Sequence, residues 1–222
     1  MPDPLRLLLV RHGQTHANVA GSLDTAHPGL DLTDLGRRQA DAAADALAAE
    51  PIEAIYVSSR VRTHQTAAPT AAARGLEPVT VDGLEEVSAG EHEMAADHDA
   101  IASYLHTVGS WIDGDHDVRM PGGESGHEFL ERYEAAVARV AAAGHRCAMV
   151  VSHGAAIRVW TSAQIDESTV PEAHARLHNT ACITLEGHPE TGWRLVSWHA
   201  DPLGGHDLED ADAPDPTGEP DD

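Results

Sequence analysis

The sequence has no lysine, only two cysteines and no long apolar run. The lack of lysine beside abundant alanine, arginine and aspartate is typical of a composition bias, so we infer no function from it. No apolar stretch approaches the roughly 18 residues that a membrane-spanning helix requires, so the sequence predicts no membrane span. Cys147 and Cys182 each lie in an apolar, strand-like segment, and we therefore expect two reduced core thiols in a cytoplasmic protein.

Acidic residues outnumber basic ones by 37 to 14, which gives the 222-residue chain a formal net charge of −23. A field of this sign repels nucleic acid and anionic lipid, so we expect neither as a partner. It also repels anionic substrates, so any phosphate chemistry must depend on a local cluster of arginines. Apart from that requirement, the charge is that of a solvated acidic surface.

The two ends of the chain differ in what they predict. Leu5–Val10 is an apolar run that stops at Arg11, and it predicts a buried strand rather than a signal peptide. Residues 201–222 hold nine acidic residues and four prolines, with very little aliphatic content. Because burial in such a segment cannot offset its ordering entropy, we expect a disordered acidic tail after a single domain over residues 1–200.

Strand-like and helix-like segments alternate along residues 1–200. Apolar runs predict strands at residues 5–10, 52–58, 78–81, 147–151, 181–186 and 193–198. Amphipathic or alanine-rich stretches predict helices at residues 34–49, 61–74, 125–143 and 155–164, and a helical insertion at about 90–121. This alternation predicts an α/β fold, a three-layer sandwich with an open, mostly parallel sheet and helices on both faces. Such sheets hold their sites at the carboxyl ends of the strands, and we expect the insertion to lie over that edge as a lid.

Candidate chemical groups follow three of the predicted strands. Arg11 and His12 come directly after the first strand, His153 follows the fourth, and Arg62 comes shortly after the second. Because the carboxyl ends of parallel strands meet at one edge, we expect these side chains to converge. Guanidinium groups bind phosphate oxygens, and a neutral imidazole can attack phosphorus. A glycine after each histidine would let a ligand approach the backbone closely. The pattern therefore predicts a pocket for a phosphoryl group.

Six ordered motifs strengthen this interpretation. They are residues 9–15 (LVRHGQT) with Asn18, residues 32–36 with Gln39, residues 58–67, residues 86–90, residues 122–125 with Arg132, and residues 151–154. In these motifs and their order over roughly positions 5–200, the chain resembles the histidine phosphatase superfamily, which includes cofactor-dependent phosphoglycerate mutases. The resemblance implies that residues 1–200 form a catalytic domain.

The resemblance also implies a role for each matching position. His12 would be the nucleophile that becomes phosphohistidine, and Glu86 the acid that protonates the leaving oxygen and then activates water. Arg11, Arg62 and His153 would hold the phosphoryl oxygens, in keeping with the importance of charge neutralisation in phosphoryl transfer. Further substrate contacts would come from polar or flexible positions of the motifs, namely Thr15, Asn18, Gly154, Glu124 and Ser125. The arginines supply the positive charge, so we expect neither a metal nor another cofactor.

Two of these assignments have neighbours as alternatives. The other candidates for the acid are Glu85, Glu91 and Glu93. Glu86 is preferred because Gly90 follows it at the spacing of the family pattern. Arg60 competes with Arg62, but the threonines that follow favour Arg62 in that pattern and leave Arg60 at the rim.

A stretch rich in histidine offers a different hypothesis, a metal site. His92, Glu93 and His98 lie within one short segment. They lack the spacing that places two ligands on one face of a helix beside a base. We therefore interpret the stretch as part of an exposed polar insertion.

The sequence favours a phosphomonoester hydrolase that acts on a small phosphorylated metabolite and releases inorganic phosphate. A phosphoglycerate mutase-type phosphotransferase and a non-catalytic module that binds a phosphorylated ligand remain the alternatives. A mutase needs extra cations around its substrate, yet within residues 91–120 only Arg119 is basic besides histidine. Tyr104, Trp111 and His106 are expected to roof the site, which favours a substrate with an uncharged body.

Overall fold

The computed structural model describes residues 3–165 and 171–218, and within them a single six-stranded sheet in the order β3-β2-β4-β1-β5-β6. The strands are β1 (Leu5–Arg11), β2 (Ala54–Val57), β3 (Val79–Thr80), β4 (Cys147–Ser152), β5 (Cys182–His188) and β6 (Gly192–His199). The first four strands in that order pair in parallel, whereas β5 is antiparallel to both β1 and β6. The expected mostly parallel sheet is therefore confirmed, with an antiparallel pair added at one edge.

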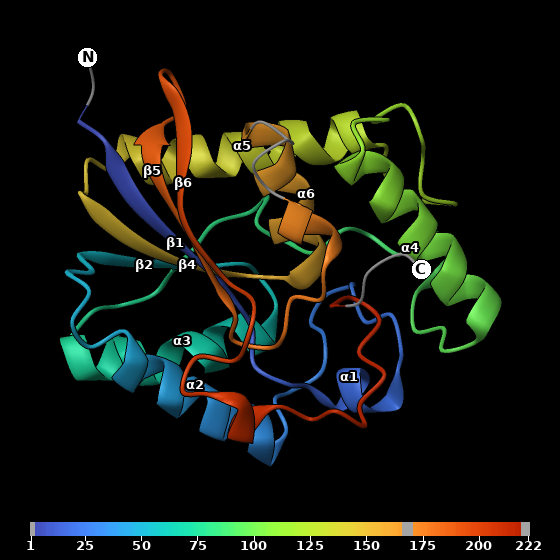
Figure 1. Cartoon of the computed structure of the whole chain (residues 1–222), viewed down its shortest axis with the longest axis horizontal. Helices are drawn as coiled ribbons and strands as arrows, with labels where there is room; N and C mark the ends of the chain where they lie inside the picture. The colour runs from blue at the N-terminus through green and yellow to red at the C-terminus, as the bar shows by residue number, and fades with distance from the viewer. Residues whose placement is uncertain (1–2, 166–170, 219–222) are drawn as a thin grey trace.

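Helices cover both faces of this sheet, as Figure 1 shows. The helices are α1 (His16–Ala20), α2 (Asp34–Ala46), α3 (Val61–Arg74), α4 (His98–Ile112), α5 (Gly126–Ala142) and α6 (Gly154–Gln164). Helices α2 and α3 lie on one face, and α5 and α6 lie on the other, with α4 packed beside α6. The three-layer α/β sandwich is confirmed. None of the helices in the described part of the chain is long and apolar enough to cross a bilayer.

The core has two halves because the sheet separates it. Along β1, Leu7 and Leu9 contribute to the larger apolar cluster, and Leu8 and Val10 contribute to the smaller one. This alternation follows from side chains that point to opposite faces of a strand. From Leu7 to Val10 both faces are buried, so this part of the strand has no polar side, as the sequence indicated, whereas Arg6 is half-buried and pairs with Glu50.

The helical insertion contains a short turn of 3-10 helix, η1 (Gly90–His92), followed by α4. Asp97 caps α4, because its side chain accepts a hydrogen bond from the backbone N–H of Ala100. Tyr104 and Trp111 lie one heptad apart on the same face of α4 and are completely buried in the larger apolar cluster. The expectation that they roof the site is wrong, since burial of large rings in the core is the more favourable use of that face.

Residues 201–218 differ most from the expectation. A disordered tail was predicted there, but the segment packs against the body of the protein, and Asp215 and Thr217 are buried. The prediction is wrong for these residues because it considered only apolar burial. A carboxylate is also buried when it pairs with a buried cation, and Asp215 lies 2.6 Å from the fully buried guanidinium of Arg11. Residues 219–222 of the predicted tail lie outside the described residues.

Candidate active site

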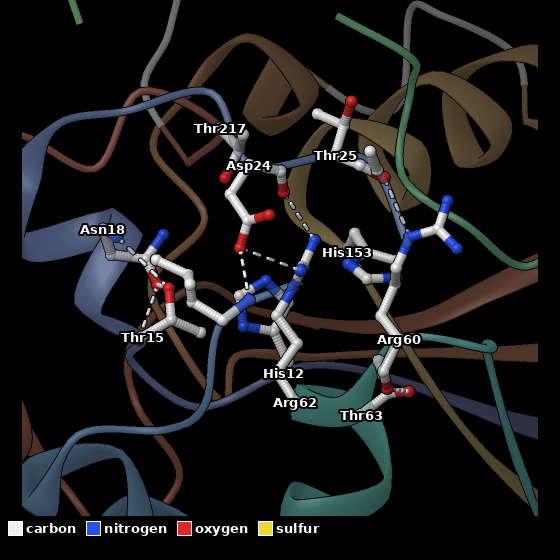
Figure 2. A network of polar contacts seen from close by, with 12 residues as sticks. His12, Thr15, Asn18, Asp24, Thr25, Arg60, Arg62, Thr63, His153 and Thr217 are labelled. Atoms are coloured by element: carbon white, nitrogen blue, oxygen red, sulfur yellow. Dashed lines mark hydrogen bonds and ion pairs between the residues drawn. The ribbon is translucent and has the colours of Figure 1, made fainter. Parts of the chain in front are cut away.

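The three adjacent parallel strands β2, β4 and β1 deliver the candidate groups to one edge of the sheet. The last residue of β1, Arg11, pairs in register with the last residue of β4, Ser152. The next residue after each strand is a histidine, so His12 and His153 lie side by side, with ring centroids 5.2 Å apart (Figure 2). Arg62 joins them from the first turn of α3, which follows β2. The structure thus brings together the side chains that the strand ends predicted.

His12 is held in one orientation by its own loop. Its Nδ1 atom lies 2.8 Å from the backbone oxygen of Gly13. A carbonyl can only accept a hydrogen bond, so Nδ1 carries the proton and Nε2 keeps its lone pair. Burial, together with the nearby Arg62 and Arg11, lowers the pKa of His12 well below its ordinary value. The ring is therefore neutral near pH 7 and is arranged to act as a nucleophile through Nε2.

The glycine after His12 serves packing, and not the approach of a ligand as the sequence suggested. A Cβ atom on Gly13 would lie 2.6 Å from the backbone oxygen of Gly36, in the first turn of α2. The backbone N–H of Gly13 donates to Thr66 Oγ1 at 2.9 Å. The loop that carries His12 therefore packs between α2 and α3, which limits its motion.

His153 has one ring nitrogen fixed and one free. Its Nε2 lies 2.8 Å from Ser58 Oγ, in the loop after β2. Within the described residues, the buried Nδ1 has no hydrogen-bond partner. Burial lowers the pKa of His153 well below its ordinary value, and the charge of Arg62 adds to this effect. The ring is a neutral group with a polar atom still available to a ligand.

Arg62 and Arg60 have different environments although they are two residues apart. Arg62 is buried, donates from NH2 to the backbone oxygen of Asp24 at 2.9 Å, and has the carboxylate of Asp24 3.4 Å from NH1. Arg60 is half-buried, donates from Nε to the backbone oxygen of Thr25, and extends its guanidinium away from His12 (Figure 2). The structure therefore places Arg62 beside His12 and directs Arg60 away from it.

Glu86 is anchored to the helix that begins immediately after His153. One carboxyl oxygen accepts hydrogen bonds from the backbone N–H groups of Val87 and Ala156, at 2.9 and 2.8 Å, and the other accepts from Ala155 at 3.3 Å. The N-terminus of α6 thus holds an anionic group, as helix N-termini do. Burial raises the pKa of Glu86, and the hydrogen bonds from Val87 and Ala156 only partly offset this. A buried carboxyl with a raised pKa is suited to donate a proton.

The neighbouring glutamates are engaged elsewhere. Glu85 is also desolvated, which raises its pKa, but hydrogen bonds from Gly83 and Ser59 more than reverse this and lower it overall. Glu93 accepts hydrogen bonds from the backbone N–H and the hydroxyl of Thr25, at 2.9 and 2.5 Å. Glu91 is exposed. The environment therefore favours Glu86 over these alternatives as the acid.

Two of the five expected substrate-binding positions line the hollow beside His12, and the other three do not. Thr15 and Asn18 line the hollow beside His12, and the pair also caps α1, because Thr15 Oγ1 accepts from Asn18 N–H and Asn18 Oδ1 accepts from Thr15 N–H. Gly154 opens α6 beside residues 201–218, where an added Cβ would lie 2.5 Å from the backbone oxygen of Thr217. Glu124 pairs with Arg132 at 2.6 Å and lines the larger of the two hollows discussed next. Ser125 caps α5 and, as far as the described residues show, lines neither of the two hollows discussed next.

Two hollows of very different size adjoin these groups. We name the hollows the nucleophile pocket and the acid cavity after the roles that the sequence predicts for His12 and Glu86. The nucleophile pocket, lined by His12, Asn18, Asp24, Arg62 and Thr217 among others, has a volume of about 10 Å³. The acid cavity has a volume of about 610 Å³ and is lined by twelve residues: Thr25, Ala26, Arg60, Asp82, Glu85, Glu86, Ser88, Gly90, Glu93, Gly122, Glu124 and Arg132. The first suits one small group at most, and the second has room for a metabolite.

Three residues at the site were not identified from the sequence as functional. Arg132 donates to the backbone oxygens of Gly83, Glu85 and Glu86 at 2.9–3.0 Å and pairs with Glu124 at 2.6 Å, so it holds the loop that carries Glu86. Asp24 pairs with Arg62, and Asp215 pairs with Arg11. Arg132 had a signal, since it belongs to a family motif. The two aspartates had none, because loop acids are common in this chain.

Comparisons with known proteins agree with this geometry. The sequence profile of the histidine phosphatase superfamily (branch 1) matches residues 7–201. A PE-PGRS family protein, PE_PGRS11 of Mycobacterium tuberculosis, is 37% identical over 88% of this chain, which spans only 36% of that protein. A probable phosphoglycerate mutase of Proteus mirabilis is 32% identical, and the match covers 87% of this chain and 90% of that protein.

Solved structures give the same answer for the fold and the family. The native structure of a mycobacterial glucosyl-3-phosphoglycerate phosphatase superposes with a TM-score of 0.74 at 27% identity, covering 89% of this chain and all of that one. A phosphoglycerate mutase of Bacillus anthracis superposes with a TM-score of 0.72 at 18% identity, which shows the shared fold alone. Taken with the profile match over residues 7–201, these likenesses establish that the chain belongs to the histidine phosphatase superfamily, branch 1.

Proposed function

We propose that this protein is a phosphomonoester hydrolase that acts through a covalent phosphohistidine on His12. The observation that carries the proposal is the state of His12: a buried, neutral imidazole whose Nδ1 proton is held by the Gly13 carbonyl, beside Arg62 and His153. Such an arrangement leaves Nε2 free to attack phosphorus. The substrate would be a small phosphorylated metabolite, and the free thiols of Cys147 and Cys182 fit a reducing, cytoplasmic location.

In the first half of the reaction, Nε2 of His12 would attack the phosphorus atom of the ester. The bond between phosphorus and the alcohol oxygen would break as the bond between phosphorus and Nε2 forms. Glu86 would give its proton to the departing oxygen, so the alcohol leaves neutral and Glu86 becomes a carboxylate. Arg11, Arg62 and His153 would stabilise the charge on the three remaining oxygens throughout.

In the second half, the Glu86 carboxylate would take a proton from water while the water oxygen attacks phosphorus. The bond between phosphorus and Nε2 would break, which returns a neutral His12 and a protonated Glu86 and releases inorganic phosphate. The surroundings of Glu86 support both roles, because burial raises its pKa while hydrogen bonds from Val87 and Ala156 still stabilise the carboxylate. None of these steps needs a metal, and no group of three or more metal-ligating side chains occurs in residues 3–165 and 171–218.

The acid cavity supports hydrolysis over the mutase alternative. A mutase must hold a substrate that carries further negative charge, yet this cavity is lined by five carboxylates and only two arginines. Of those arginines, Arg132 is already paired with Glu124. In the insertion, the exposed Arg119 is paired with Glu128 at 2.7 Å. Relatives carry both phosphatase and mutase names, so the preference for hydrolysis depends on the charge of this cavity.

The proposal is tested by trapping the intermediate. Wild-type protein mixed with a phosphomonoester labelled in its phosphoryl group and quenched during turnover should carry acid-labile label on His12. His12→Ala should carry no label and should lose essentially all phosphate release. Label on another residue, or an active His12→Ala, would overturn the mechanism.

The matched control is His16→Ala, which removes a nearby exposed histidine and should keep both label and turnover. The same samples separate the alternatives when 3-phosphoglycerate is supplied. A mutase would return an isomerised phosphoglycerate with little free phosphate, and a non-catalytic module would return the substrate unchanged and carry no label.

A further inference from the structure

Residues 201–218 run from the edge of the sheet past α2 to the neighbourhood of α1 (Figure 1). They leave β6, pass α2, where Gln39 Nε2 donates to the backbone oxygen of Leu208 at 2.8 Å, and then reach α1. There the backbone N–H of Asp215 donates to the backbone oxygen of Asn18 at 3.2 Å. The profile of the superfamily ends at residue 201, so this path lies beyond the shared catalytic fold.

The carboxylate of Asp215 binds the groups that are expected to hold a phosphoryl group. Both of its oxygens accept from the Arg11 guanidinium, at 2.6 and 2.7 Å. One of them also accepts from Asn18 Nδ2 at 2.7 Å. This forked, charge-assisted contact is the one that an arginine makes with two oxygens of a phosphate. Asp215 therefore makes with Arg11 the contact that we expect of a substrate oxyanion.

Thr217 also takes up space beside His12. Its Oγ1 accepts from Arg11 NH2 at 3.1 Å, and its side chain lines the nucleophile pocket with His12 and Arg62. The remaining volume of about 10 Å³ holds at most about one water molecule. A phosphoryl group does not fit beside His12 while residues 213–218 are in this place.

We propose that residues 213–218 are an intramolecular inhibitor, with Asp215 as a carboxylate mimic of the phosphoryl group, and that they must leave before a phosphorylated ligand binds. The proposal rests on the proposed function only in assuming that this pocket takes a phosphoryl group. A phosphate dianion carries more charge than a carboxylate and offers an additional oxygen to Arg62 and His153, so it can displace the segment. The apparent affinity for phosphate is then the intrinsic affinity reduced by the fraction of open molecules.

The alternative is that Asp215 supports the site by orienting Arg11. The two predictions are opposite in sign. Removal of an inhibitor strengthens phosphate binding, because the carboxylate of Asp215 no longer competes with phosphate for the guanidinium of Arg11. Removal of a support weakens phosphate binding.

The test is calorimetric titration of the full chain with inorganic phosphate. Asp215→Ala and Asp215→Asn should bind phosphate at least about tenfold more tightly than wild type. Asp212→Asn removes the same charge from an exposed position in the same segment and should change the dissociation constant by less than about twofold. Unchanged or weaker binding by the Asp215 variants would overturn the proposal. The readout involves no turnover, so it is independent of whether His12 is the nucleophile.

A second measurement needs no variant. In wild-type protein, the amide hydrogens of Asp215 and Gly218 are hydrogen-bonded, to Asn18 O and Asp215 O respectively. Saturating inorganic phosphate should make both exchange faster with solvent, while the core amides of β1 stay protected. Equal or slower exchange at Asp215 and Gly218 with phosphate bound would show that the segment does not leave, and would also overturn the proposal.

Discussion

The nucleophile pocket and the acid cavity serve one proposed reaction but are built from different parts of the chain. The pocket is formed at a strand end and at helix N-termini, since His12 follows β1, Thr15 caps α1 and Arg62 lies in the first turn of α3. Loops line most of the cavity, including the segments between β3, α4 and α5 that carry Ser88 and Glu124. In the proposed reaction, the sheet would therefore fix the geometry of phosphoryl transfer, while loops would decide which alcohol is accepted.

The two hollows also differ in charge. Arg11 and Arg62 are the cations beside His12, and the carboxylates of Asp215 and Asp24 oppose their charges, so this hollow is close to neutral. The acid cavity has an excess of carboxylates. A substrate that enters with its phosphoryl group toward His12 places its alcohol among those carboxylates, so the difference in charge orients it. It also disfavours a second anionic group on the alcohol.

The largest effect expected from this comparison concerns Glu86, the proposed acid. An alkyl phosphate expels a basic alkoxide and needs a proton, whereas nitrophenyl phosphate expels a stable phenolate and hardly needs one. Glu86→Ala should therefore slow phosphorylation of His12 by alkyl phosphates about 10²–10⁴-fold more than by nitrophenyl phosphate. The measurement is the single-turnover rate of the first step with both substrates.

Glu85→Ala is the matched control for this experiment. Its carboxylate is bound to Ser59 and Gly83, so its loss should scale both substrates alike. If the leaving-group dependence appeared in Glu85→Ala and not in Glu86→Ala, the acid would be Glu85. If it appeared in neither, the division between the two hollows would fail.

The next largest effect distinguishes the two arginines. Arg62→Ala removes a buried, preorganised donor beside His12 and should lower kcat by roughly 10²–10³-fold. Arg60→Ala removes a half-buried cation from the acid cavity and should act mainly on KM, by a few-fold. Steady-state kinetics with one phosphomonoester suffice. The reverse ranking would place the phosphoryl group in the larger hollow.

Much of the division between the two hollows was predictable from the sequence, because apolar runs indicate where the strands end. Apolar runs that stop at Arg11 and at Ser152 locate two histidines at the same edge of the sheet, whatever the loops do. Asp24 and Asp215 were not predictable as partners of the arginines. Asp215 lies 204 residues from Arg11 in sequence, and an acidic residue in a loop carries no periodic signal that would reveal such a pair.

The burial of Tyr104 and Trp111 shows a second reason for the limits of prediction. The amphipathic pattern of α4 correctly predicted a helix, but it did not show whether the apolar face would pack against the core or lie over the site. The apolar face packs against the core. The acid cavity is lined instead by glutamates from the loops before and after α4. Sequence pattern fixes that a face is buried, whereas only the packing of other elements decides against what.

A smaller effect is expected from the positioning residue of the acid cavity. Arg132→Gln removes the donors that hold the backbone of Gly83, Glu85 and Glu86, so the acid should be displaced. We expect roughly a tenfold loss with alkyl phosphates and less with nitrophenyl phosphate, since misplacing a reacting group by about 1 Å costs up to ~10²-fold. Arg119→Gln, which breaks a surface pair with Glu128, should change neither rate. Equal losses on both substrates would reduce Arg132 to a purely structural role.

The pH profile should reflect the opposite displacements of two pKa values. Burial, Arg62 and Arg11 lower the pKa of His12 below 6.5, whereas burial raises the pKa of Glu86 above 4.5. Because His12 must be neutral and Glu86 protonated, kcat/KM for an alkyl phosphate should fall as pH drops through the first value and as it rises through the second. Each limb should approach about tenfold per pH unit.

Glu86→Gln isolates one limb of that profile. The substrate titrates identically with both proteins, so the difference between the two profiles reports the carboxyl group alone. The alkaline limb assigned to Glu86 should be missing from the variant. Its persistence would contradict the assignment.

The smallest expected effect is that of a chelator. Guanidinium groups supply the positive charge in the proposed mechanism, so dialysis against EDTA should leave kcat and KM within error of the untreated protein. The check is phosphate release before dialysis, after dialysis, and after addition of Zn²⁺ or Mg²⁺. A sharp loss restored by either ion would replace the arginine mechanism with a metal-assisted one.

The hydrogen bonds of Glu86 make its two carboxyl oxygens unequal. Oε1 accepts two short bonds from backbone N–H groups, whereas Oε2 accepts a single one at 3.3 Å. A proton on Oε1 would displace a backbone donor, so the acid form keeps its proton on Oε2. In the proposed mechanism, proton delivery from Glu86 would then have a fixed direction relative to the sheet, set by α6 and independent of the alcohol. Bulk close to the ester oxygen that blocks this one line of approach would exclude a substrate, while bulk further away would be tolerated.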